Sequence, residues 1–72
     1  MKKYYKTDYF LFQDAGTHIV QSELDYAGNT VINTETLYTN QEQYRRVRRG
    51  IRLYRDNCKE ITEDEYHLLR IS

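Results

Sequence analysis

Six arginines stand within thirteen consecutive residues, in the segment QYRRVRRGIRLYR at positions 43–55. Arginine carries a planar fork of N–H donors that matches phosphate and carboxylate groups, and it stacks on aromatic rings. Lysine would serve solubility equally well, so the exclusive use of arginine in this segment favours a surface that binds anions. The residues that we expect to make these contacts are Arg45, Arg46, Arg48, Arg49, Arg52 and Arg55.

Three interpretations of this arginine cluster are open. The first is a solvated helix face, neutralised locally by Asp56, Glu60 and the acids that follow them. The second is binding to nucleic-acid phosphates, for which the segment needs no base-reading side chains. The third is binding to an acidic protein surface, on a partner that the chain inhibits or escorts or on a second copy in a homodimer. We take nucleic-acid binding as the leading hypothesis and the protein partner as the alternative.

The other residues that could do chemistry do not form a recognisable site. Cys58 could act as a nucleophile only with a base at His18 or His67, and these two histidines lie far apart in the sequence. A buried cysteine and two surface histidines are the simpler interpretation. A metal site would need closely spaced pairs of cysteine or histidine, and the sequence has none. The sequence therefore predicts a non-enzymatic binding module with no catalytic residue, metal or cofactor.

Charge is segregated along the chain although it cancels in total, with eleven basic and eleven acidic residues. Residues 7–38 carry five acids and no lysine or arginine, whereas residues 39–55 carry the six arginines against one glutamate. Residues 56–72 are again acidic, with five acids against two basic residues. This pattern makes one face basic only if the acidic segments fold away from it.

The elements that must position the arginines begin with a sheet. Residues 3–13, KYYKTDYFLFQ, are rich in aromatic residues and predict a first strand. Residues 18–24 and the β-branched residues 31–38 predict two more strands. Glycine beside polar residues at 14–17 and 25–30 predicts a turn after each of the first two strands. Three strands joined by two short turns form an antiparallel meander.

A helix is predicted to follow from residue 39 onward. Residues 39–42, TNQE, form a capping box in which Thr39 caps the N–H of Glu42. Five residues at spacings of three and four then fall within an arc of about 80° on a helical wheel: Tyr44, Val47, Ile51, Tyr54 and Cys58. The arginines occupy the adjoining arc.

Gly50 leaves an alternative open within this segment, because glycine in a helix interior costs about 1 kcal/mol relative to alanine. In that alternative the helix ends near Arg49, with Gly50 as the residue after the C-cap, and residues 51–55 form a fourth strand. We expect the longer helix, because five correctly spaced positions outweigh one glycine.

A short second helix is predicted near the end of the sequence. Thr62 and Glu65 form another capping box, and Ile61 with Tyr66 fits a hydrophobic staple. We therefore expect an α+β fold, a three-stranded antiparallel β-meander followed by a long amphipathic helix and a short C-terminal helix, in one small domain over residues 1–72.

Two further features of the sequence bear on the cellular compartment. No stretch approaches the length and apolar character of a membrane span. Cys58 is the single cysteine and cannot form an intrachain disulfide, which suits a reducing compartment. We expect an intracellular, cytoplasmic protein that does not associate with membranes.

Overall fold

The computed structural model describes residues 2–25, 27, 31–32, 36–52 and 57–71. The described chain forms an α+β fold, as the sequence predicts, with more strands than the predicted meander. In chain order its elements are β1 (Lys3–Lys6), β2 (Phe10–Asp14), β3 (Ile19–Glu23), β4 (Thr36–Tyr38), α1 (Gln41–Arg52), β5 (Lys59–Ile61) and α2 (Glu63–Ile71).

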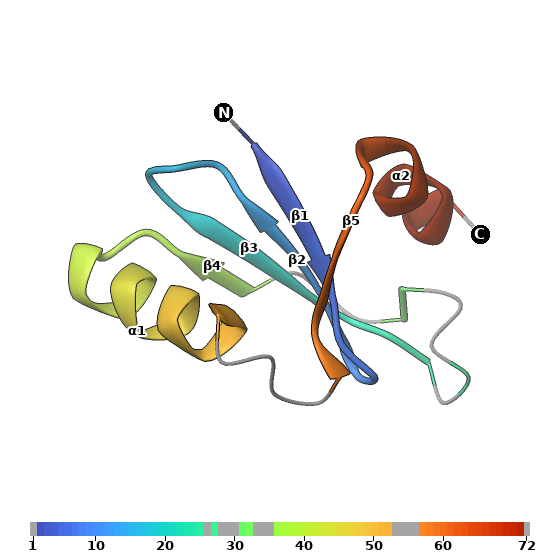
Figure 1. Ribbon diagram of the computed structural model, residues 1–72, viewed down its shortest axis with the longest axis horizontal. Helices are drawn as coiled ribbons and strands as arrows, with labels where there is room; N and C mark the ends of the chain where they lie inside the picture. The colour runs from blue at the N-terminus through green and yellow to red at the C-terminus, as the bar shows by residue number, and fades with distance from the viewer. Residues whose placement is uncertain (1, 26, 28–30, 33–35, 53–56, 72) are drawn as a thin grey trace.

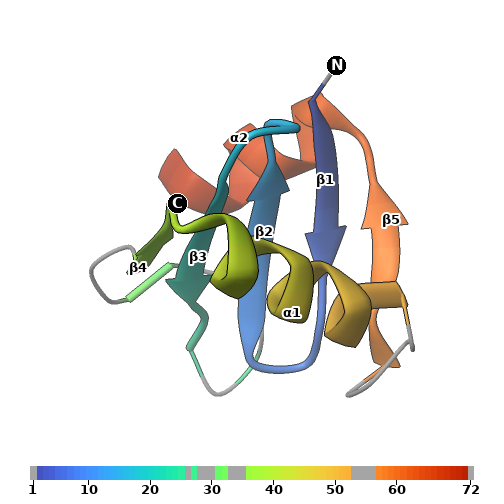
Figure 2. The same ribbon diagram turned by 90° about the vertical axis from the view of Figure 1, so that its left-hand side faces the viewer.

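Within the described residues, five strands form one antiparallel sheet in the order β4-β3-β2-β1-β5. Helix α1 packs on one face of this sheet and α2 on the other, so the molecule has three layers (Figure 1). Figure 2 looks through α1 onto the sheet, with α2 behind it. No helix in the described part of the chain has the length and apolar character needed to cross a membrane.

The first aromatic stretch is a hairpin rather than the single strand predicted. β1 and β2 pair with each other, with Lys6 opposite Leu11. The turn between them is held by Thr7, whose Oγ1 accepts hydrogen bonds from the backbone N–H groups of Tyr9 (3.2 Å) and Phe10 (2.9 Å). A threonine side chain can stabilise a turn in this way without glycine or proline, so the sequence carries no strong signal for this turn.

The remaining strands agree with the prediction in part. The turn at 14–17 is confirmed, with Gly16 at a φ of 90° and its N–H donating to Asp14 Oδ1 at 2.9 Å. Within the predicted strand 31–38, β4 covers Thr36–Tyr38 and Val31 forms an isolated bridge to Leu24, whereas residues 33–35 lie outside the described residues. β5 is not predicted, and it extends the sheet by pairing with β1. Most of the predicted turn at 25–30 lies outside the described residues.

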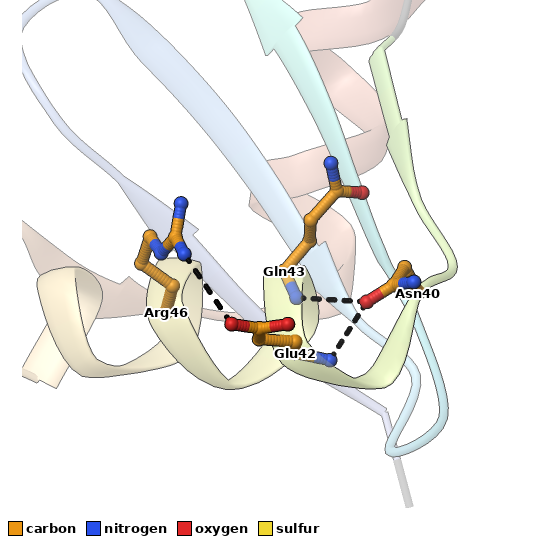
Figure 3. Close-up of polar contacts among 4 residues, drawn as sticks. All are labelled: Asn40, Glu42, Gln43 and Arg46. Carbon is orange, nitrogen blue, oxygen red and sulfur yellow. Dashed lines mark hydrogen bonds and ion pairs between the residues drawn. The ribbon is translucent and has the colours of Figure 1, made fainter.

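Helix α1 begins one residue later than the capping box predicts. Asn40 rather than Thr39 is the N-cap, since its Oδ1 accepts hydrogen bonds from the backbone N–H groups of Glu42 (2.9 Å) and Gln43 (3.3 Å) (Figure 3). Asparagine is at least as good an N-cap as threonine. The Glu42 carboxylate then lies in the first turn, where the helix dipole favours negative charge.

The described end of α1 distinguishes between the two predicted helix lengths. The helix continues through Gly50 to Arg52, so the alternative in which it ends near Arg49 is wrong. Residues 53–55, which the prediction assigns to the same helix, lie outside the described residues. The prediction that Cys58 lies on this helix is wrong, because Cys58 directly precedes β5.

Each face of the sheet has its own hydrophobic cluster, because side chains alternate between faces along a strand. The cluster beneath α1 contains Phe12, Ile19, Tyr44, Ile51 and Cys58. The cluster beneath α2 contains Tyr4, Leu11, Leu24, Ile61 and Tyr66.

The capping box predicted for the second helix is confirmed. The N–H of Glu65 donates to Thr62 Oγ1 at 3.1 Å, and the N–H of Thr62 donates to Glu65 Oε1 at 3.2 Å. Tyr66 then lies buried beneath α2 together with Ile61.

Candidate functional site

Helix α1 is fixed on the sheet by the apolar stripe that the sequence predicts. Tyr44 and Ile51 are buried, and Val47 packs against the same cluster. Because these three residues face the sheet, the helical repeat turns Arg45 and Arg49 toward solvent. Arg46 and Arg48 are also exposed. We call Arg45, Arg46, Arg48 and Arg49 the arginine face.

One edge of the arginine face is anchored by a buried carboxylate at the end of β2. Asp14 Oδ1 accepts a hydrogen bond from the Tyr44 hydroxyl at 2.8 Å, and Oδ2 lies 3.9 Å from Arg48 Nε. Asp14 is buried, whereas the Arg48 side chain is half exposed. The guanidinium of Arg48 also lies 6.0 Å from the centroid of the Tyr44 ring. Asp14 therefore holds both the helix and one of its arginines in place.

Arg46 has a different environment on the outer side of the helix. Its Nη2 lies 3.7 Å from Glu42 Oε1, one helical turn earlier, and both side chains are more than three-quarters exposed (Figure 3). An exposed pair at this spacing contributes roughly 0.3–0.5 kcal/mol. Such a pair restrains Arg46 only weakly.

Arg45 and Arg49 are the least restrained members of the face. Among the described residues, neither has an acidic group within 4.0 Å of its guanidinium. They are one helical turn apart, and together with Arg46, Gln41 and Glu42 they line a shallow hollow on the outer surface of α1. The described helix carries one acidic residue, Glu42, against its arginines.

The structure thus gathers four of the six predicted arginines on one exposed helix surface. Arg52 is the last residue of α1, and its side chain is not among those that the structure describes. Arg55 lies outside the described residues altogether. The role of Asp14 is absent from the sequence prediction, since the residue belongs to a turn signal thirty positions from Tyr44.

The residues weighed for catalysis lie in separate parts of the described structure. Cys58 is buried beneath α1, and this burial raises the pKa of its thiol, which disfavours the nucleophilic thiolate. His67 is on α2, with Nε2 3.5 Å from Glu63 Oε1, and His18 lies 3.1 Å from the Thr17 hydroxyl. The described residues contain no group of three histidine, cysteine or acidic side chains arranged to hold a metal.

Comparison of the chain with protein-family models, with curated proteins and with solved structures finds no match.

Proposed function

We propose that the protein binds nucleic-acid backbones through the arginine face of α1. The observation that carries the proposal is the pair Arg45 and Arg49, exposed one helical turn apart and without an acidic partner among the described residues. A guanidinium can donate two parallel hydrogen bonds to one phosphate. Two such groups on one helix surface, flanked by Arg46 and Arg48, suit a polyanion that presents phosphates in series.

The composition of the α1 surface favours a nucleic acid over a folded protein. Stable protein interfaces are organised around buried aromatic or aliphatic anchors. Among the described residues, the large hydrophobic side chains that are exposed all lie outside α1: Tyr9, Ile32, Leu37 and Leu68. The arginine face offers charge and hydrogen-bond donors without an apolar centre, which is how phosphate backbones are bound.

The existing ion pairs present little obstacle to phosphate binding. The pair Arg46–Glu42 is exposed, so a phosphate can replace this contact at small cost. The half-exposed Arg48 can bind a phosphate while it keeps its contact with the buried Asp14. We expect little sequence preference, because backbone contacts carry no direct sequence information.

The test is the salt dependence of binding to labelled duplex DNA and single-stranded RNA, followed by fluorescence anisotropy. Four phosphate contacts predict a log–log slope of roughly −3 to −4 on duplex DNA, at about −0.9 per contact. Replacing Arg45 and Arg49 with glutamine should reduce the magnitude of that slope by about 2. The matched control, Arg45→Lys with Arg49→Lys, keeps both charges and should keep the slope.

Two outcomes would overturn the proposal. One is the absence of binding to either probe at about 50 mM salt, where phosphate contacts are strong. The other is a slope that the glutamine variant leaves unchanged while its amide spectrum remains that of the folded protein. In either case the acidic-protein alternative becomes the leading hypothesis for the arginine face.

A further inference from the structure

A second concave surface lies on the opposite side of the sheet from the arginine face. It is a groove of about 340 Å³ between α2 and the paired strands β1 and β5. We call it the lysine groove, because Lys6 and Lys59 line it together with the apolar residues Ile61, Leu68 and Leu69. Its volume lies within the range of roughly 300–1,000 Å³ that is typical of small-molecule sites.

The two lysines are brought together by the register of the sheet. Lys6 on β1 is directly opposite Lys59 on β5, so both side chains leave the same face. Among the described residues, neither ammonium group has an acidic group within 4.0 Å. Like charges directly opposite each other destabilise a sheet. The repulsion between Lys6 and Lys59 therefore lowers the stability of the fold, and no ion pair among the described residues offsets it.

Protection of the sheet edge explains only one of these lysines. β5 is an edge strand, and an edge lysine discourages pairing with other chains. β1 is an interior strand between β2 and β5, so Lys6 has no edge to protect. The second positive charge therefore needs another explanation, and an anion between the two ammonium groups provides one.

The acidic residue on the rim is already engaged in the fold. Glu65 lines the groove, but its Oε1 accepts hydrogen bonds from the N–H and the hydroxyl of Thr62, at 3.2 and 3.1 Å. These bonds hold the carboxylate at the start of α2. Neither carboxylate oxygen of Glu65 lies within 4.0 Å of the Lys6 or Lys59 ammonium group, so the lysine pair is left accessible to an anionic ligand.

Three aliphatic side chains, those of Ile61, Leu68 and Leu69, supply apolar surface to the groove. Ile61 is buried at the base and Leu69 packs against the same cluster, whereas Leu68 is 62 % exposed on the rim. An aliphatic chain lying along these side chains would remove their surface from water, which is favourable in proportion to the area covered.

We infer that the lysine groove binds a free fatty carboxylate, with its head group between Lys6 and Lys59 and its chain along Leu68 and Leu69. Each ammonium donates hydrogen bonds to the carboxylate, and the head group cancels the repulsion between the two lysines. This site is separate from the arginine face, on the other side of the sheet, and it stands or falls independently of nucleic-acid binding.

The experiment is a titration of the isotopically labelled protein followed by amide NMR. Octanoate supplies both the charge and the chain, whereas acetate supplies only the charge and 1-octanol only the chain. Octanoate should shift the amides of β1, β5 and α2 and bind at least tenfold more tightly than acetate or 1-octanol. Vesicles of anionic phospholipid test the other source of a charged aliphatic group, and they should not compete with octanoate.

Variants inside and outside the groove separate the effect of the groove from that of net charge. Lys6→Gln with Lys59→Gln should weaken octanoate binding at least tenfold and leave 1-octanol binding unchanged. The matched control, Lys2→Gln with Lys3→Gln, removes the same charge outside the groove and should bind octanoate within twofold of the original chain. Equal affinity for octanoate and 1-octanol overturns the inference, as do shifts confined to α1 and binding to vesicles without binding to octanoate.

Discussion

Replacing Gly50 with alanine should stabilise the protein. Gly50 lies inside α1, two residues before Arg52 at its end, and its backbone does not have a positive φ. A Cβ added there meets no atom within 4 Å. Gly50 also lines an apolar cavity of about 230 Å³ between α1 and the sheet. Alanine can therefore enter without displacing any neighbour.

The expected gain follows from the helix alone. Glycine in a helix is less favourable than alanine by roughly 0.5–1 kcal/mol, because it loses more backbone freedom on folding. For a domain of this size, 1 kcal/mol corresponds to roughly 4–8 °C in Tm. Gly50→Ala should thus raise the Tm by a few degrees.

Gly16 provides a matched control for this substitution. A Cβ at Gly16 also meets no atom within 4 Å, but its φ is +90°, which L side chains rarely adopt. Gly16→Ala should therefore lower the Tm, although the steric space is equally open. The two substitutions differ in backbone conformation rather than in packing.

The assay is thermal and urea unfolding of the three proteins, followed by far-UV circular dichroism. A lower Tm for Gly50→Ala would refute the assignment of Gly50 to the helix and restore the alternative in which it ends α1. Equal changes at the two glycines would refute the argument that φ decides the sign.

Four further substitutions test contacts on both sides of the sheet by urea unfolding. Tyr44→Phe should lower the free energy of unfolding by roughly 1.5–3 kcal/mol, because it removes a hydrogen bond to a buried carboxylate. Tyr38→Phe removes a bond to a neutral amide and should cost roughly 0.5–1.5 kcal/mol; equal losses would contradict the anchoring role of the carboxylate. Thr62→Ala should cost roughly 0.5–2 kcal/mol by removing the N-cap of α2, and no loss would mean that the cap is dispensable. Lys59→Glu should raise stability by roughly 0.2–1 kcal/mol, because it replaces a like-charge pair with an opposite one; a loss would refute repulsion at this position.

The parts of the fold that could be predicted depend on interactions between residues close in sequence. The buried stripe Tyr44, Val47 and Ile51 follows from helical periodicity, and the structure places all three against the sheet. The Thr62 capping box and the turn at Gly16 are likewise read from a few adjacent residues. In each case the residues that predict the structure and the residues that form it lie close together in the sequence.

The parts that could not be predicted depend on pairing between distant segments. β5 is three residues long and exists through its pairing with β1. The break between β1 and β2 is made by the Thr7 side chain, in a run of aromatic residues that hides it. Cys58 fits the spacing of the helix stripe and reaches the same cluster from outside the helix, so periodicity alone assigned it wrongly.

The same distinction applies to the candidate sites. The arginine face could be predicted because composition and helical spacing define it. The contribution of Asp14 could not, since it depends on a hydrogen bond between residues thirty positions apart. The lysine groove depends on the register of β1 with β5, which places Lys6 opposite Lys59. Because the sequence pattern does not predict β5, this pairing of the two lysines could not be predicted either.

The three-layer arrangement explains how a chain with no net charge can carry a basic face. The acids Glu63, Asp64 and Glu65 begin α2, and the arginines lie on α1, so the sheet stands between them (Figure 1). The longest extent of the molecule, 31 Å, runs from one helix layer to the other, whereas screening at physiological salt acts over about 8 Å. These three acids therefore contribute to the neutral total charge without cancelling the field at α1. The same geometry bears on self-association, because a contact between the arginines of one copy and these acids of another joins unlike surfaces. Such a head-to-tail contact forms a closed ring where the rotation between copies allows it and an open row where it does not.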